Sequence, residues 1–278
     1  MCGRAASRME GIAVMTLFQL FFTTQIPENM RYRSFTLLHF VLLLGVAAGI
    51  LISARHIKRA DSPRKEKMLL VFTWALPGMY LLRFVVFWLL DSFVEPQMAL
   101  LDRMPFHLCA MNAIVMPVAV AKKNKTLLNY MYAIALPAAV AAMLTPAMSY
   151  YGRYFYFSWQ VLFFFLDHGL MALVAVLAVC GGLLRPDVKE LPRVAVLFVA
   201  YAAIIYPVNK LLNQNYLFLN YPDQGTVMAF FAKYLGNPGY LVPLALLAAA
   251  VVLLMYLPWI LIDRKTQPPS GTDEQIDK

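Results

Sequence analysis

The sequence predicts an all-α fold, a polytopic membrane helix bundle of seven transmembrane helices with a short interfacial helix near the N-terminus. Three observations support this fold class. First, 61% of the 278 residues are apolar and only 14% are charged, whereas a soluble domain carries about a quarter charged residues. Second, the apolar residues gather in stretches long enough to cross a bilayer. Third, the basic residues fall mainly in alternate connections between these stretches.

The predicted transmembrane domain covers residues 35–262, after an N-terminal segment, 1–34. A helix rises 1.5 Å per residue, so each predicted span covers about 27 to 36 Å. The seven spans are residues 35–53, 68–90, 104–121, 127–148, 157–180, 191–208 and 239–262. The last segment, 263–278, contains Pro, Ser and Gly, and this composition predicts a disordered tail.

The stretch Gly11–Ile26 is shorter and more polar than the other apolar segments. It has only 16 residues and contains Thr16, Gln19, Thr23 and Thr24. We expect an interfacial helix there, with a short span as the alternative. No small-residue cleavage site follows it, so a removed signal peptide is not expected.

The positive charges predict the orientation of the bundle. Of the 24 basic residues, 15 fall in loop 54–67, in the two later connections on the same side or in the C-terminal tail, and four fall in the alternate connections. The positive-inside rule therefore predicts a multi-pass protein of the cell membrane with a cytoplasmic C-terminus. The net charge of +9 is explained by this topology, and no nucleic-acid partner is expected.

Polar side chains within the spans are costly in hydrocarbon, so each needs a partner or a function. Asp167 is the only acid among them, and an Arg83–Asp167 pair is the simplest structural expectation. Binding of a lipid phosphate by Arg83 is the functional alternative. The polar set in or next to the spans is His39, Arg83, His107, Cys109, Asn112, Asn129, Asp167, His168 and Asn209.

Cys109 and His168 are the candidate nucleophile and base, because a cysteine becomes reactive when a histidine removes its proton. His107 is two residues from Cys109, and a helix turns their side chains about 200° apart. His168, on another span, is therefore the better base. Asp167 diverges from His168 by about 100°, so another group must orient the imidazole. The alternative is a buried, inert cysteine.

Three asparagines and an aromatic run have two possible roles each. Asn112, Asn209 and Asn215 either bind a headgroup or oxyanion, or satisfy exposed backbone at helix ends. The run 150–159 either anchors the chain at the interface as an aromatic belt or gates a lipid site. The long connection after the sixth span is expected to carry a short helix. No histidine pair has the spacing of metal ligands, so no metal or cofactor is implied.

Three motifs give the chain a family resemblance. His107-Leu108-Cys109, Asp167-His168-Gly169-Leu170 and Asn215-Tyr216-Leu217-Phe218-Leu219 resemble segments of the bacterial YwaF-like integral membrane proteins, a group similar to the transmembrane protein 164 acyltransferases. The resemblance covers residues 35–259. It implies transfer of a fatty acyl chain from a phospholipid to a lysophospholipid through a thioester on Cys109, with His168 as base.

The expected enzyme is thus an acyltransferase, with lipid hydrolysis as a variant when water accepts the acyl group. The expected substrate-binding residues are His39, Arg83, His107, Asn112, Asn209 and Asn215. Two alternatives stay open. One is a transporter or small-molecule binding protein that uses Arg83 and Asp167, and the other is a scaffold without catalysis. Expected partners are the bilayer, phospholipid and lysophospholipid, and the sequence does not indicate an oligomeric state.

Overall fold

The computed structural model describes residues 21, 26–90 and 104–266, and within them the fold is all-helical as predicted, with one isolated bridge between Arg31 and Phe155. The predicted helix Gly11–Ile26 lies outside the described residues except for positions 21 and 26. The helices over the predicted spans are α3 (Leu37–Arg59), α4 (Ser62–Leu90), α5 (Leu108–Lys122), α6 (Lys125–Tyr130), the π-helical turn η3 (Met131–Ala135), α7 (Leu136–Leu144), α9 (Trp159–Cys180), α10 (Leu191–Leu212) and α12 (Leu241–Thr266). Shorter helices are η1 (Glu28–Met30), α8 (Met148–Tyr151), η4 (Val188–Glu190), η5 (Tyr216–Phe218) and α11 (Val227–Leu235).

Six helices in the described part of the chain are long and apolar enough to cross a membrane, which makes this a multi-pass membrane protein. The third predicted span, 104–121, was placed too early. Its helix α5 begins at Leu108 and has 15 residues, about 22 Å. Contacts from distant residues explain the late start: the Tyr201 hydroxyl donates to the Phe106 carbonyl at 2.9 Å, and the His107 ring packs edge-on against Tyr216.

The other helix ends differ from the predicted spans for two reasons. At the basic end, α3 continues past residue 53 to Arg59 and α4 begins at Ser62 rather than 68, because long basic side chains can stay helical while their charges reach water. The fourth span is interrupted by η3, just before Pro137, which has no N–H for a helical hydrogen bond. α12 takes in 263–266 of the predicted tail, and 267–278 lie outside the described residues.

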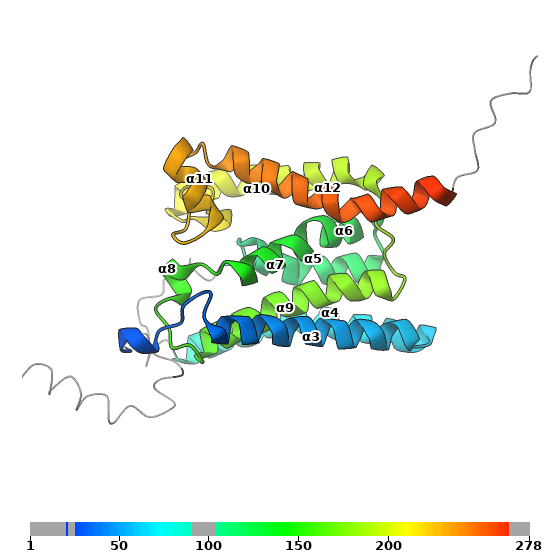
Figure 1. The fold of residues 1–278 in the computed structure, drawn as a ribbon, viewed down its shortest axis with the longest axis horizontal. Helices are drawn as coiled ribbons and strands as arrows, with labels where there is room; N and C mark the ends of the chain where they lie inside the picture. The colour runs from blue at the N-terminus through cyan, green and yellow to red at the C-terminus, as the bar shows by residue number, and fades with distance from the viewer. Residues whose placement is uncertain (1–20, 22–25, 91–103, 267–278) are drawn as a thin grey trace, which may run out of the picture.

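The long helices run side by side in three layers (Figure 1). One outer layer holds α10 and α12, the middle layer holds α5, α6 and α7, and the other outer layer holds α3 and α4, with α9 between it and the middle layer. α9 is the central helix: it contacts α3, α4, α5 and α7, and 72% of its most apolar stretch is buried, against 6% for α12. The absence of a side chain at Gly169 permits the close approach of α3, since a Cβ there would lie 2.9 Å from Val46.

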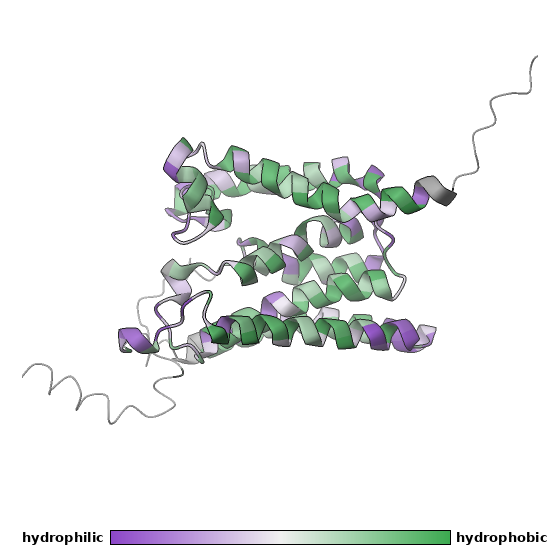
Figure 2. Ribbon diagram, viewed as in Figure 1, coloured by the Kyte–Doolittle hydropathy of each residue, from purple (hydrophilic) through white to green (hydrophobic). Residues whose placement is uncertain are grey.

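The long helices consist of hydrophobic residues along most of their length, with hydrophilic residues gathered mainly at the ends (Figure 2). Large apolar side chains on α10 and α12, such as Val199, Ile204, Leu246 and Leu254, are exposed. A soluble protein does not expose apolar surface of this extent, whereas a lipid-facing surface is expected to be apolar.

A buried polar cluster joins the layers at the end of the bundle where α6 begins. The Oδ1 atom of Asn129 accepts hydrogen bonds from the Asp187 N–H at 2.9 Å and the Tyr256 hydroxyl at 3.0 Å, and its Nδ2 donates to the Lys125 carbonyl. A hydrogen bond from Lys125 holds the pKa of Asp187 below its ordinary value. Nearby, the buried Glu190 accepts from Thr126 and Arg193. This cluster fixes α10 and α12 to α6.

Replacing Asn129 with leucine is expected to lower the free energy of unfolding by about 2 kcal/mol, because the buried Tyr256 hydroxyl and the part-buried Asp187 N–H lose their partner. The corresponding fall in Tm is about 4–8 °C for a chain of this size, measured by thermal unfolding of the purified protein. Lys189→Leu, at an exposed position on η4, is the control and should leave Tm unchanged. Equal Tm values for both variants would show that the cluster adds no stability.

Candidate functional site

The buried polar residues of the candidate site come together where α4 approaches its end and α5 and α9 are near their beginnings. Arg83 belongs to α4, Cys109 to α5, and Asp167 and His168 to α9. α4 contacts both α5 and α9, so the three helices bring these side chains into one region. We call these four residues the Arg83 site.

Arg83 is the charged centre of this site. Its guanidinium lies within electrostatic reach of Cys109, Asp167, Tyr150 and Tyr151, and of His107 and His168. Its Cζ atom is 6.0 Å from the centroid of the Phe163 ring. The structure therefore brings the predicted Arg83 and Asp167 together, and adds the cysteine and both histidines around the same positive charge.

Cys109 occupies the second position of α5, immediately after the helix start. The preceding His107 has extended φ and ψ of −73° and 150° and makes no side-chain cap, and the first helical hydrogen bond runs from the Met111 N–H to the His107 carbonyl at 3.0 Å. The thiol is free and partly buried. The N–H groups of Cys109 and Ala110 lie within hydrogen-bonding reach of its sulfur. Such free amides at a helix N-terminus favour negative charge on sulfur or on a nearby oxyanion.

His168 is held by a backbone carbonyl one turn earlier on α9. Its Nδ1 lies 2.9 Å from the Phe164 carbonyl oxygen, and because that oxygen can only accept, Nδ1 donates. The neutral imidazole then has its lone pair on Nε2. The Asp167 carboxylate is 4.0 Å from Nδ1, too far for a hydrogen bond. Phe164 thus supplies the orienting group whose identity the sequence did not reveal.

A contact one turn deeper aligns the cysteine and histidine helices. The Nδ2 atom of Asn112 on α5 points to the Met171 sulfur on α9 at 3.9 Å. Cys109 is three residues before Asn112, and His168 is three residues before Met171. Residues three apart share a helix face, and both helices run in the same direction away from this end of the bundle (Figure 1). This register puts Cys109 and His168 at a similar depth on the two helices.

Asn112 and His39 already have intramolecular partners. The Oδ1 atom of Asn112 accepts from the Tyr130 hydroxyl at 3.0 Å. His39 accepts from the Phe35 N–H at Nδ1 and lies 2.9 Å from the Met143 carbonyl at Nε2, so its ring joins α3 to α7. Substrate binding by these two residues stays a prediction, and the observed hydrogen bonds give each a structural role.

The two asparagines after α10 shape the connection that follows. The Asn209 amide accepts from the Tyr216 N–H at 2.8 Å and donates to the Tyr216 carbonyl at 2.9 Å. Asn215 accepts from the Asn220 N–H at 3.0 Å and donates to the Tyr221 carbonyl at 2.9 Å. Their role in substrate binding likewise stays a prediction. By holding Tyr216, Asn209 also fixes the ring that packs against His107.

Three tyrosines lie next to the Arg83 site. Tyr80 was not singled out from the sequence; it lies within electrostatic reach of Arg83, Cys109 and Asp167, and its position three residues before Arg83 on the same helix face was an available signal. Tyr150 and Tyr151 belong to the aromatic run that was expected either to anchor the chain or to gate a lipid site. Both lie within electrostatic reach of Arg83, and the Tyr151 ring packs on Phe164 at 4.4 Å between centroids. The short helix predicted in the long connection after the sixth span is α11, which contacts α12.

The chemistry available here is that of a thiol, an imidazole, a carboxylate and a guanidinium in an otherwise apolar bundle. Within the described ranges, no group of three or more His, Cys, Asp or Glu side chains is placed to hold a metal ion. The family model of the TMEM164 family matches residues 31–256, which is most of the chain and includes every residue of the Arg83 site. No curated protein and no solved structure is significantly similar to the chain.

Proposed function

This chain belongs to the TMEM164 family, and from that membership and the Arg83 site we propose that it is a lipid acyltransferase of the membrane. Cys109 is the nucleophile and His168 the general base. The observation that carries the proposal is the placement of the thiol at the start of α5 at the depth of His168, whose Nε2 is the proton acceptor. The resemblance of its motifs to those of the transmembrane protein 164 acyltransferases supports the reaction class.

In the first step, Nε2 of His168 removes the proton of the Cys109 thiol, and the thiolate attacks the carbonyl carbon of a phospholipid ester. The tetrahedral intermediate collapses with loss of the C–O bond, the leaving lysophospholipid oxygen takes the proton from His168, and a thioester remains. In the second step, the hydroxyl of a second lysophospholipid gives its proton to His168 and attacks the thioester. The C–S bond breaks, the departing sulfur takes the proton back from His168, and the Cys109 thiol is restored. Water in place of that hydroxyl gives hydrolysis.

The negative charge of both intermediates needs donors. The N–H groups of Cys109 and Ala110, which reach the sulfur, serve the carbonyl oxygen. Arg83 binds the lipid phosphate. Its positive charge lies beside the thiol, and its side chain comes from α4, whereas Cys109 belongs to α5. His107, whose ring packs on Tyr216 and Phe218, forms the wall on the side of the connection after α10. Asn112, Asn209 and Asn215 position these groups.

The donor lipid comes from the outer leaflet of the cell membrane. The Arg83 site lies at the end of the bundle opposite the basic loop 54–67, and the positive-inside rule assigns that loop and the C-terminus to the cytoplasm.

The proposal is tested with purified protein in liposomes that contain a phospholipid with a deuterated acyl chain and an unlabelled lysophospholipid. Mass spectrometry should detect the deuterated chain on the second lipid, at a rate proportional to protein. Free deuterated fatty acid without transfer would assign a hydrolase instead. No movement of the label at all would contradict the proposal.

Arg83→Gln is expected to lower kcat/KM for acyl transfer by about 100-fold, since a charge-assisted contact to the substrate is lost. Arg83→Lys keeps the charge but not the paired donors, and should recover part of this loss, mostly through KM. Arg33→Gln is the control, because Arg33 is an exposed arginine outside the Arg83 site. Equal kcat/KM values for Arg83→Gln and Arg33→Gln would show that Arg83 does not bind the substrate.

A transporter that uses Arg83 and Asp167 is the second candidate, and it is favoured by the electrostatic contact between the buried Asp167 and the partly buried Arg83. It predicts that substitutions of Arg83 and Asp167 abolish function while Cys109→Ala is tolerated. The acyltransferase predicts a larger loss for Cys109→Ala than for Arg83→Gln, so the cysteine variant separates the two.

A further inference from the structure

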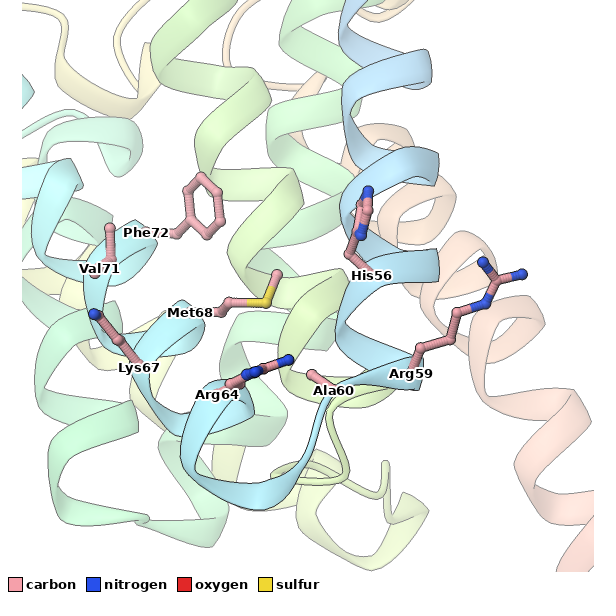
Figure 3. Close-up of a pocket in the computed structure, with 8 residues that line it drawn as sticks. All are labelled: His56, Arg59, Ala60, Arg64, Lys67, Met68, Val71 and Phe72. Atoms are coloured by element: carbon pink, nitrogen blue, oxygen red, sulfur yellow. The ribbon is translucent and has the colours of Figure 1, made fainter.

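A cavity lined by basic and apolar side chains lies at the other end of the bundle from the Arg83 site, between the last turns of α3 and the first turns of α4. Its volume is about 430 Å³, and it is lined by His56, Arg59, Ala60, Arg64, Lys67, Met68, Val71 and Phe72. Figure 3 shows Arg64, Met68 and Phe72 extending from α4 in the direction of α3. None of these residues belongs to the Arg83 site.

The position of the cavity is the level at which headgroups meet acyl chains. Both lining helices are candidate membrane spans, and the cavity lies where α3 ends at Arg59 and α4 begins at Ser62. Arg64 and Arg83 are nineteen residues apart on α4, which corresponds to about 28 Å. The two regions are therefore separated by most of the bilayer thickness.

The mouth of the cavity is cationic. Arg59, Arg64 and Lys67 line it, and the surrounding segment 54–67 holds six basic and two acidic residues, a net charge of +4. The two acids do not neutralise this positive charge. Asp61 pairs with Arg64 at 3.6 Å, with both side chains exposed, and the Glu66 carboxylate lies 4.0 Å from the Nζ atom of Lys123, the residue that follows α5. Exposed pairs of this kind are weak, so an anion can compete for Arg64.

The inner wall is apolar. Met68 and Phe72 are partly buried and pack against the hydrophobic core, and the exposed Val71 continues their surface along α4. The cavity thus places basic groups at the membrane surface directly beside apolar side chains that lead into the hydrocarbon region. A soluble anion would use only the first feature, whereas a phospholipid uses both.

We propose that this cavity binds a phospholipid with an anionic headgroup, its phosphate between Arg64 and Lys67 and the start of an acyl chain against Met68, Val71 and Phe72. The volume lies within the range of small-molecule sites, and clustered basic residues beside a span attract anionic lipid. This site goes beyond the proposed reaction, because it is remote from Cys109 and His168.

The test measures lipid retained by the detergent-purified full-length protein in native mass spectrometry, with phosphatidylglycerol, phosphatidylcholine or inorganic phosphate added. The unmodified protein should bind phosphatidylglycerol about tenfold more tightly than phosphatidylcholine. The double variant Arg64→Gln/Lys67→Gln should weaken phosphatidylglycerol binding about tenfold. Its control, Arg55→Gln/Lys58→Gln, removes two exposed charges of the same segment that do not line the cavity, and should weaken binding less than threefold.

A second pair of variants tests the wall without relying on the basic residues. Val71→Glu puts a negative charge inside the cavity, and Leu70→Glu puts one at a neighbouring exposed position that does not line it. Only Val71→Glu should lower phosphatidylglycerol binding. Equal losses in the lining and control variants would mean diffuse attraction to the basic surface and would overturn the site. Displacement of phosphatidylglycerol by inorganic phosphate at similar concentration would overturn the lipid as its ligand.

Discussion

Cys109→Ala is expected to reduce acyl transfer by on the order of 10³-fold or more, because no other group in the Arg83 site can form the thioester. The liposome assay with the deuterated phospholipid measures the rate. Brief incubation of the unmodified protein with donor lipid alone should leave one acyl chain attached, and hydroxylamine should release it. Peptide mass spectrometry should locate that chain on Cys109.

Cys180→Ala is the matched control, since Cys180 is the other free cysteine in the described part of the chain and ends α9 at its opposite end. It should retain the rate of the unmodified protein. Cys109→Ser keeps nearly the size of the side chain but replaces the thiol by a much less acidic hydroxyl. It should transfer the acyl chain at least 100-fold more slowly than the unmodified protein. An unchanged rate for Cys109→Ser would exclude the cysteine mechanism.

His168→Gln is expected to lower kcat by about 10²- to 10⁴-fold, the range that a general base contributes. Glutamine retains a polar side chain of similar reach on α9 but cannot accept and return a proton near neutral pH. Because Cys109 and His168 act in the same step, the double variant Cys109→Ala/His168→Gln should be no slower than Cys109→Ala alone. The same deuterium assay gives all three rates.

His56→Gln serves as the control, because His56 is an exposed histidine at the basic end of α3. His107→Gln tests the rival base: its ring packs on Tyr216 and Phe218, and we expect a change in KM larger than the change in kcat. If His107→Gln abolished kcat while His168→Gln did not, the assignment of the base would be wrong.

Much of this architecture followed from composition, since a backbone in hydrocarbon must satisfy its polar groups within the segment and therefore forms helices. The predicted spans over α3, α4, α9, α10 and α12 needed only changes at their ends. The same reasoning found Arg83, Cys109, Asp167 and His168, because ionisable side chains within apolar stretches are rare enough to be singled out. The sequence predicted that Asp167 lies beside the guanidinium of Arg83, but it did not predict that Cys109 and His168 lie near that same charge.

Contacts between distant residues decided what hydropathy could not. Tyr201 and Tyr216 hold the residues before α5 out of the helix, so Cys109 lies at a helix start rather than inside a span. Phe164 orients His168 through a backbone carbonyl, a group that every residue has and that no side-chain pattern reveals. Asn209 looked like a substrate ligand or a cap, and its observed partner is the backbone of Tyr216.

Composition and hydropathy are enough to show that the chain is a helical membrane protein and to find the polar side chains within its spans. They do not show which helix is central, because that depends on how the helices pack. α9 and α12 have similar mean hydropathy, 2.2 and 2.5, yet 72% of the most apolar stretch of the first and 6% of that of the second are buried in the protein. Lipid and protein interior are both apolar surroundings, so the hydropathy of a helix does not tell which of the two it faces.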